Sequence, residues 1–164
     1  MALNDELLAN NAAYAAHFDA EALRLRPARE IAILTCMDSR VTAQGELGLR
    51  LGDAHVIRNA GGRVTEDALR SLVISAALLG TRTAVVIHHF NCGLYGTSNE
   101  ALRERVAEVT GAPVDIDFLP FADLEASVRE DVAALRSYPH FPPGYEVLGY
   151  TYDVITGRLT PVSA

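Results

Sequence analysis

Two runs of consecutive apolar residues stand out along the chain and predict buried strands. They cover Ile31–Cys36 and Thr83–Ile87, and both are short and rich in β-branched side chains. Continuous apolar runs of this length are typical of parallel strands that are covered on both faces. A third strand is predicted over Ala54–Asn59, between a loop at Gly45–Gly52 and a pair of glycines.

Helical spacing of apolar positions between and around these runs predicts four helices. The predicted helices cover residues 3–25, 68–79, 99–110 and 123–138. Thr65 and Asp123 are suited to cap the second and the fourth of these helices. Near the end of the chain, Glu146–Val154 and Leu159–Val162 predict two strands joined by a tight turn.

Strands that alternate with helices in this way predict an α/β fold. We expect a mostly parallel central sheet of four to five strands flanked by helices. The chain has 164 residues, of which 49% are hydrophobic, and this length fits one domain over residues 1–164 with a single core.

Composition and charge exclude several classes of function. The chain carries 21 acidic against 14 basic residues, so it lacks the basic surface of a nucleic-acid-binding protein. All 14 basic residues are arginine, which excludes Schiff-base chemistry and a P-loop lysine. No apolar run approaches the ~20 residues of a membrane span. Because the first residues lack a basic start and an apolar stretch, we expect a cytoplasmic location.

The only two cysteines of the chain, Cys36 and Cys92, each follow one of the apolar runs. The carboxyl ends of parallel strands meet at one edge of an open α/β sheet, so we expect these thiols to lie together. His89 stands three residues before Cys92. Two thiolates and one imidazole suit Zn²⁺, and three protein ligands leave a fourth position open, as in catalytic sites. The alternative is that both cysteines are inert, small buried residues.

Asp38 and Arg40 follow Cys36 at two-residue spacings. A carboxylate and a guanidinium so placed can form a bidentate contact beside the metal. The alternative is a solvated ion pair that contributes little. His88 points to the face of the strand opposite His89, so we expect it to be packed or hydrogen-bonded rather than catalytic.

The two motifs and the stretch between them resemble one known family. Residues Cys36–Arg40 fit the pattern C-x-D-x-R, and His89–Gly93 fit H-x-x-C-G, both of which are found in the β-class carbonic anhydrases. Residues 52–62 are similar to that family's second strand and glycine turn. The residues of these motifs are most similar to those of the short bacterial and archaeal branch, which also contains hydrolases of carbon disulfide and carbonyl sulfide.

The resemblance implies reversible hydration of carbon dioxide to bicarbonate and a proton by a zinc-bound hydroxide. It assigns Cys36, His89 and Cys92 to the zinc ion. Asp38 would accept a hydrogen bond from the hydroxide, and Arg40 would hold Asp38 in place. In part of this family the aspartate instead binds zinc as a fourth ligand in a closed state, and the same state is a hypothesis for Asp38.

The resemblance also implies a substrate pocket and a partner. The backbone N–H of Gly93 is expected to meet a substrate oxygen, and Ala60 and Gly61 are expected to line a small apolar pocket. The family places this pocket at a dimer interface. We therefore expect a homodimer at least, with the N-terminal helix at 3–25 packing on the partner subunit. Glu46, His55 and buffer remain alternative proton carriers.

Residues at three positions differ from those of the short branch, so the identity of the substrate is not decided by the resemblance. Phe90, Asn91 and Leu94 stand where many members carry threonine, aspartate and methionine. A bulky Phe90 can narrow the entrance to the pocket. One alternative function is therefore hydrolysis of CS₂ or COS by the same metal site. The other is a noncatalytic zinc-binding homologue that kept the scaffold without turnover.

Overall fold

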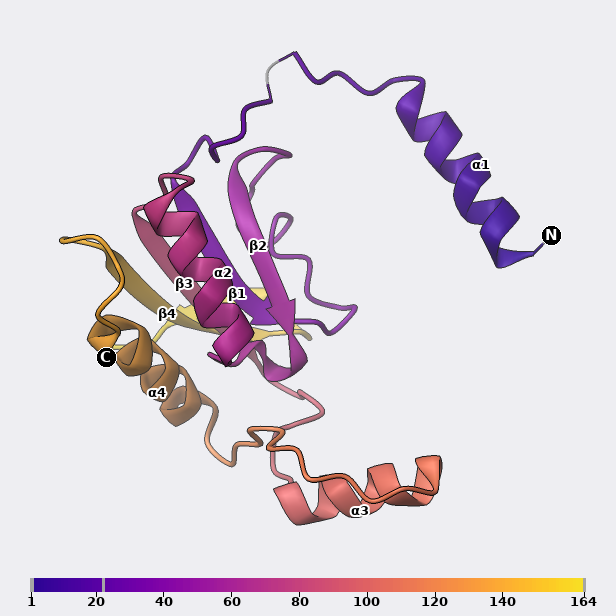
Figure 1. Cartoon of the computed structure of the whole chain (residues 1–164), viewed down its shortest axis with the longest axis vertical. Coiled ribbons are helices and arrows are strands. Elements are labelled where there is room, and N and C mark those ends of the chain that lie inside the picture. The colour runs from indigo at the N-terminus through magenta and orange to yellow at the C-terminus, as the bar shows by residue number, and fades with distance from the viewer. Residues whose placement is uncertain (1, 22, 164) are drawn as a thin grey trace.

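A computed structural model describes residues 2–21 and 23–163, and within them five strands form one sheet (Figure 1). The strands are β1 (Ile31–Cys36), β2 (Ala54–Asn59), β3 (Thr83–His89), β4 (Glu146–Asp153) and β5 (Arg158–Pro161). Their order in the sheet is β2-β1-β3-β4-β5. The first four strands run parallel, and β5 is antiparallel to β4. This arrangement confirms the predicted α/β fold with a mostly parallel sheet.

Three of the four described helices begin at a side chain that caps them, and the first helix has no such cap. The described helices are α1 (Leu3–Ala15), α2 (Glu66–Ala77), α3 (Asn99–Thr110) and α4 (Leu124–Ser137), with a short 3₁₀ turn η1 at Ala60–Gly62. Thr65 accepts a hydrogen bond from the Ala68 amide at the start of α2. Asp123 does the same for the Ala126 amide at the start of α4. Both caps agree with the prediction, and each satisfies a backbone N–H that lacks a partner within its helix.

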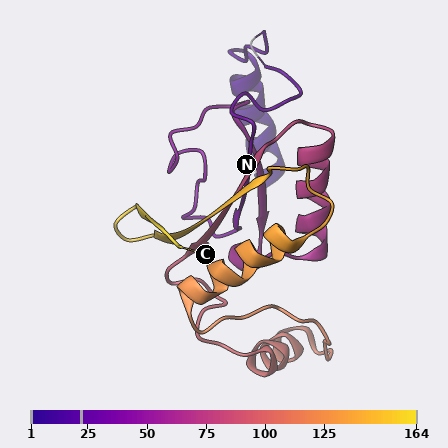
Figure 2. The same ribbon diagram turned by 90° about the vertical axis from the view of Figure 1, so that its left-hand side faces the viewer.

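Both faces of the central strands are buried. Helices α2 and α4 cover one face, as Figure 2 shows from the side. Apolar residues from β1, β3 and these two helices form the core there, including Leu34, Leu72, Val86 and Val132. The other face of the sheet packs against residues of the loop after β1. This two-sided cover explains the continuous apolar runs in the sequence, and it holds the carboxyl ends of β1 and β3 side by side.

The N-terminal helix is shorter than the predicted helix at 3–25, which was wrong in its end point. Helix α1 ends at Ala15, and one residue of the predicted range, at position 22, lies outside the described residues. Beyond the helix, the Asp19 carboxylate accepts a hydrogen bond from the Glu21 amide. An aspartate that bonds to the backbone two residues on offers the chain a turn in place of a helix.

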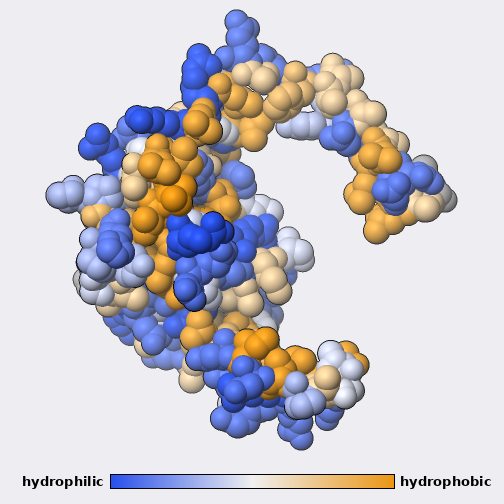
Figure 3. Space-filling view, in the orientation of Figure 1, coloured by the Kyte–Doolittle hydropathy of each residue, from blue (hydrophilic) through white to orange (hydrophobic). Residues whose placement is uncertain are grey.

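Two helices extend away from the sheet. Neither α1 nor α3 has a buried residue among those described, and Figure 1 shows both apart from the central body. Apolar side chains gather along the arm that carries α1 (Figure 3), where Leu3, Leu7 and Leu8 are exposed. Of the helices in the described residues, none has the length and apolar character needed to cross a membrane.

Candidate metal centre

The sheet brings the two cysteines and one histidine together, although Cys36 and Cys92 are 56 residues apart in sequence. Cys36 is the last residue of β1, His89 is the last residue of β3, and Cys92 lies in the turn that follows. Their three ligand atoms lie within 4.8 Å of one another, and all three residues are buried. Parallel pairing of β1 with β3 creates this convergence, because both strands end at the same edge of the sheet.

The donor atoms fit a tetrahedral metal ion. The two sulfurs are 4.0 Å apart, and two sulfurs at zinc's usual ~2.3 Å in a tetrahedron lie about 3.8 Å apart. Nδ1 of His89 lies 2.9 Å from the carbonyl oxygen of Phe90, which leaves Nε2 to face the thiols. Nε2 is buried and has no hydrogen-bond partner among the residues that the structure describes. A buried nitrogen without a partner is costly unless a ligand binds it.

The two thiols also perturb each other. Their contact lowers the pKa of Cys36 to about 4 and raises the pKa of Cys92, because one sulfur donates its proton to the other. A stable thiolate is already a metal ligand. Binding of a cation would remove the second proton as well, since metal ligation requires deprotonated cysteines.

Asp38 and Arg40 form the bidentate contact at the rim of this group. Nε of Arg40 donates to Oδ1 of Asp38 at 2.9 Å, and a terminal nitrogen donates to Oδ2 at 2.7 Å. The same guanidinium also donates to the carbonyl of Asn91. These hydrogen bonds hold the pKa of Asp38 below its usual value of 3.8. The Oδ2 atom lies 3.8 Å from Nε2 of His89. An ionised carboxylate therefore faces the metal group, our name for Cys36, His89 and Cys92.

A cavity of about 560 Å³ opens beside the group and is lined by most of the predicted site residues. The lining residues are Cys36, Met37, Asp38, Ser39, Arg40, Ala60, Gly61, Cys92, Gly93 and Leu94. Of the residues expected at or near the site, His89, Phe90, Asn91, Glu46 and His55 are not in this lining. Phe90 is 45% exposed and its ring packs 6.4 Å from the ring of Tyr95. Glu46 accepts a hydrogen bond from Thr42.

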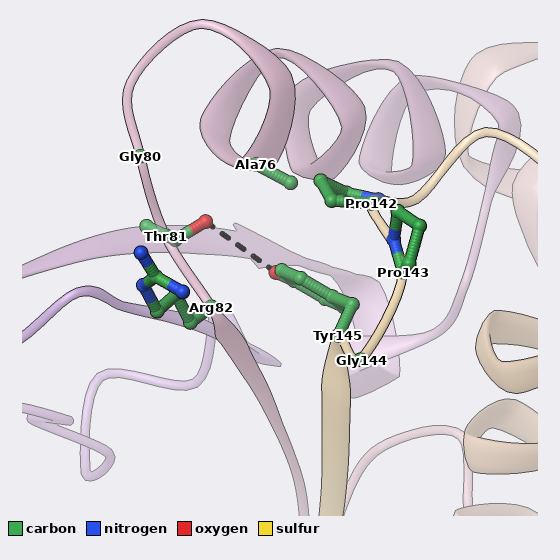
Figure 4. Close-up of a pocket in the computed structure, with 8 residues that line it drawn as sticks. All are labelled: Ala76, Gly80, Thr81, Arg82, Pro142, Pro143, Gly144 and Tyr145. Carbon is green, nitrogen blue, oxygen red and sulfur yellow. Dashed lines mark hydrogen bonds between the residues drawn. The ribbon is translucent and has the colours of Figure 1, made fainter.

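His55 also lies away from the cavity, since its Nδ1 is 2.8 Å from the hydroxyl of Ser75 on α2. The Ser75 hydroxyl is hydrogen-bonded to the Thr81 hydroxyl, which is in turn hydrogen-bonded to the hydroxyl of Tyr145. A second cavity of about 220 Å³ lies at this place. Figure 4 shows the residues that line it, among them Thr81, Tyr145 and the two prolines before Tyr145. It lies where β3 and β4 begin, at the opposite end of the strands from the metal group.

The glycine pair Gly61–Gly62 closely approaches the backbone of the two strands that end at the site. Gly62 has a φ of +71°, and a Cβ built there would lie 2.9 Å from the backbone nitrogen of Cys36 and 3.0 Å from the carbonyl oxygen of Ile87. Only glycine tolerates both the left-handed backbone and this spacing. The turn η1 therefore packs directly on the strand ends that carry the metal group.

Two arginines near the site were missed by the sequence analysis. Arg58 on β2 donates to the carbonyl of Cys36 at 3.0 Å and to that of Asp38 at 2.7 Å, which fixes the backbone between them. Arg63, which follows the glycine turn, is buried and paired with Asp131 of α4. Two signals in the sequence were available. Arg58 lies on a strand whose other residues are half-buried, and Asp131 lies on the apolar face of α4.

His88 points away from the metal group, as its place on the strand requires. Its Nδ1 lies 2.8 Å from the hydroxyl of Ser127, and its Nε2 lies 3.1 Å from Oδ2 of Asp131. The ring also stacks on Phe121 at a centroid distance of 5.7 Å. His88 thus occupies the core between β3 and α4.

Comparison with known proteins agrees with this geometry. The sequence profile described as carbonic anhydrase matches residues 31–112. Beta-carbonic anhydrase 1 of Mycobacterium tuberculosis is 36% identical over 163 residues, which cover 99% of each chain. A crystal structure of carbonic anhydrase from Streptococcus mutans superposes with a TM-score of 0.93 at 46% identity, again over 99% of each chain.

A carbon disulfide hydrolase of Acidithiobacillus thiooxidans is 30% identical over 154 residues, which cover 81% of this chain and 77% of that protein. This identity is lower than that of the Mycobacterium protein, and the match covers less of both chains. The match of the family profile and the full-length similarity to the anhydrases together assign the sequence to one family. The chain belongs to the β-carbonic anhydrase family.

Proposed function

We propose that this protein hydrates carbon dioxide reversibly to bicarbonate and a proton, with Zn²⁺ held by Cys36, His89 and Cys92. The observation that carries the proposal is the convergence of three buried soft ligands beside a cavity that also contains an ionised carboxylate. A purely structural zinc site has four protein ligands and no open position. A noncatalytic homologue would have no use for a carboxylate fixed beside that position.

Zinc bound there would lower the pKa of a water molecule from ~15.7 toward ~7, so that a nucleophile forms at neutral pH. Asp38 accepts the hydrogen bond of the attacking oxygen and so directs its lone pair toward the carbon of CO₂. Arg40 fixes that carboxylate through two hydrogen bonds. A closed state with Asp38 as a fourth metal ligand requires the carboxylate to leave Arg40, and it stays a hypothesis.

The substrate would bind in the cavity against Ala60 and Gly61. Carbon dioxide carries no charge, so an apolar wall and one hydrogen-bond donor suffice to orient it. The backbone N–H of Gly93 is the donor in this proposal, because Gly93 lines the same cavity directly after a metal ligand. A side chain at position 93 would meet open space, since no atom lies within 4 Å of a Cβ built there.

Stopped-flow CO₂ hydration with metal-quantified protein tests the proposal. We expect activity in the wild type and a large loss in Asp38→Ala with the zinc content unchanged. The matched control is Asp67→Ala, which breaks an aspartate–arginine pair on the exposed surface of α2. Inactive wild-type protein with a full complement of zinc would refute the proposal. Activity that survives in Asp38→Ala would refute the role of the carboxylate.

Hydrolysis of carbon disulfide or carbonyl sulfide is the second candidate, and the similarity to a carbon disulfide hydrolase favours testing it. The same ligands would attack the carbon of either linear, apolar molecule. Sulfide release from CS₂ and COS should be measured beside CO₂ hydration on one preparation. Release of sulfide without CO₂ hydration would replace the first candidate with the second.

We further propose that the protein forms a homodimer in which α1 packs on the partner subunit. Helix α1 buries none of its described residues against its own chain, yet it exposes Leu3, Leu7, Leu8 and Tyr14. Apolar residues of this size are usually covered in the functional assembly. We also propose a cytoplasmic location, because both cysteines are free thiols and the cytosol keeps thiols reduced.

Light scattering at micromolar concentration tests the dimer. We expect the triple variant Leu3→Ser, Leu7→Ser, Leu8→Ser to shift the wild-type dimer toward the monomer. The control replaces three exposed polar residues of the same helix, Asn4→Ser, Asn10→Ser and Asn11→Ser, and should leave the mass unchanged. A wild-type monomer with full activity would contradict the proposal.

A further inference from the structure

Directly behind the metal centre lies a buried charged pair that the proposed reaction does not use. Asp131 is 4% exposed and Arg63 is 5% exposed. Ionised groups are rarely this buried unless they are paired and fully hydrogen-bonded. The pair joins α4 to the residue that follows the glycine turn, although the two residues are 68 positions apart in sequence.

The Asp131 carboxylate contacts four nitrogen atoms of three residues, which come from two separate segments. Its Oδ2 accepts from Nε of Arg63 at 2.9 Å and from the backbone amide of Val64 at 3.1 Å. Its Oδ1 accepts from a terminal nitrogen of Arg63 at 3.3 Å. On the other side, Nε2 of His88 lies 3.1 Å from Oδ2. Asp131 therefore links the start of the segment after the turn to the end of β3.

The Arg63 guanidinium is held from several sides as well. It donates to the carboxylate of Glu130 at 2.6 Å and to the carbonyl of Leu119 at 3.1 Å. The backbone carbonyl of Arg63 accepts from the side-chain amide of Asn59 at 2.7 Å. Both ends of the three-residue turn Ala60–Gly62 are consequently fixed, one by β2 and the other by α4.

The turn so fixed touches the site on two sides. Gly61 lines the cavity. Gly62 packs on the backbone of Thr35 and Cys36, at a distance that leaves no room for a Cβ. A displacement of Arg63 and Val64 would therefore move the cavity wall and release the backbone that carries the first metal ligand.

We propose that Asp131 is a positioning residue, which acts through Arg63 and Val64 to hold the glycine turn against Cys36 and to fix Gly61 in the cavity wall. A carboxylate suits this role, because it accepts several hydrogen bonds at once and compensates the buried guanidinium. Asp131 does not touch the reacting atoms. The inference rests on the proposed function for its effect on catalysis, but not for its effect on the turn.

The test compares Asp131→Asn with Asp123→Ala in the full-length protein. Asp123 caps the same helix, and within the described residues its side chain makes no hydrogen bond to the turn, so its loss weakens α4 without releasing Arg63. We expect amide hydrogen exchange in residues 61–64 to be about ten-fold faster in Asp131→Asn and nearly unchanged in Asp123→Ala. We also expect kcat/KM for CO₂ to fall about ten-fold in Asp131→Asn alone, as displaced site geometry predicts.

A further variant keeps the proposal testable if Asp131→Asn does not fold. Arg63→Lys retains the charge but removes the forked donors, and it should show the same two changes with smaller size. Unchanged exchange in residues 61–64 of a folded variant would overturn the proposal, as would equal effects of Asp123→Ala. Should the wild type lack CO₂ hydration, the proposed function fails, while the exchange measurement still decides whether Asp131 holds the turn.

Discussion

Replacing Gly62 by alanine should damage the protein at one defined place. The residue has a φ of +71°, and a Cβ there would lie 2.9 Å from the Cys36 backbone nitrogen and 2.9 Å from the Thr35 carbonyl carbon. These atoms belong to β1, which lies between β2 and β3, so the neighbouring strands prevent them from moving aside. Gly157 offers a matched control, because it has the same φ of +71° with no atom within 4 Å of its Cβ position.

The magnitude follows from separating backbone strain from collision. A left-handed backbone costs a non-glycine residue roughly 1–2 kcal/mol. Reduced freedom of the unfolded chain returns about 0.4–1 kcal/mol. Both terms apply equally to Gly157→Ala, so that variant should lose no more than about 1–2 kcal/mol. The collision in Gly62→Ala adds about 1–3 kcal/mol, as overpacking does in other cores.

Urea unfolding of both variants measures this difference. We expect Gly62→Ala to be less stable than Gly157→Ala by about 1–3 kcal/mol. We also expect Gly62→Ala alone to lose zinc affinity, since the collision displaces the backbone of Cys36. Equal stability of the two variants, or an unchanged zinc affinity in Gly62→Ala, would refute the close approach of the turn to β1, the strand that carries Cys36.

Three more predictions follow from the contacts of the site. Arg40→Gln should lower kcat/KM for CO₂ roughly ten- to hundred-fold with zinc retained, because Asp38 loses its fixed orientation, whereas Arg70→Gln on the surface should not. Burial alone would raise the pKa of Asp131, but hydrogen bonds from its histidine and arginine partners lower that pKa below 3.8. The ionised carboxylate therefore stabilises the fold fully above pH 3.8, and this stabilisation is lost as the pH falls further. Urea unfolding between about pH 6 and pH 3 should therefore show a steeper acid loss for the wild type than for Asp131→Asn, and parallel curves would contradict this. Removal of zinc with a chelator should lower the Tm by about 8–16 °C if zinc is present at a thousand-fold excess over its Kd, and an unchanged Tm would show that no metal stabilises the fold.

The sequence predicted those parts of the fold that depend on local pattern. The bounds of β1 and α3 follow from a buried apolar run and from helical spacing that ends at a glycine, and both were predicted to the residue. The N-terminal helix was predicted too long, because apolar residues continue at helical spacing to Leu25 although α1 ends at Ala15. That spacing carries no information on the bond made by the side chain of Asp19. This side chain accepts a hydrogen bond from the Glu21 amide and turns the chain.

The candidate site was predictable where one strand end carries a recognisable motif, and not where distant segments meet. Cys36 and Cys92 could be brought together from the rule that parallel strands end at one edge. No such rule joins Arg63 to Asp131, since a buried ion pair between a turn and a helix leaves no periodic pattern. Asp131 did offer a sign, because it lies among Val128, Val132 and Leu135 on the buried face of α4.

X-ray absorption at the zinc edge of the purified protein reports which atoms bind the metal. We expect one zinc per chain, with two sulfur ligands at about 2.3 Å and one nitrogen at about 2.0–2.1 Å, together with a light atom in the remaining position. We also expect Cys36→Ser to remove one of the sulfur contributions. Zinc bound by oxygen and nitrogen alone, or the absence of stoichiometric metal, would contradict the account.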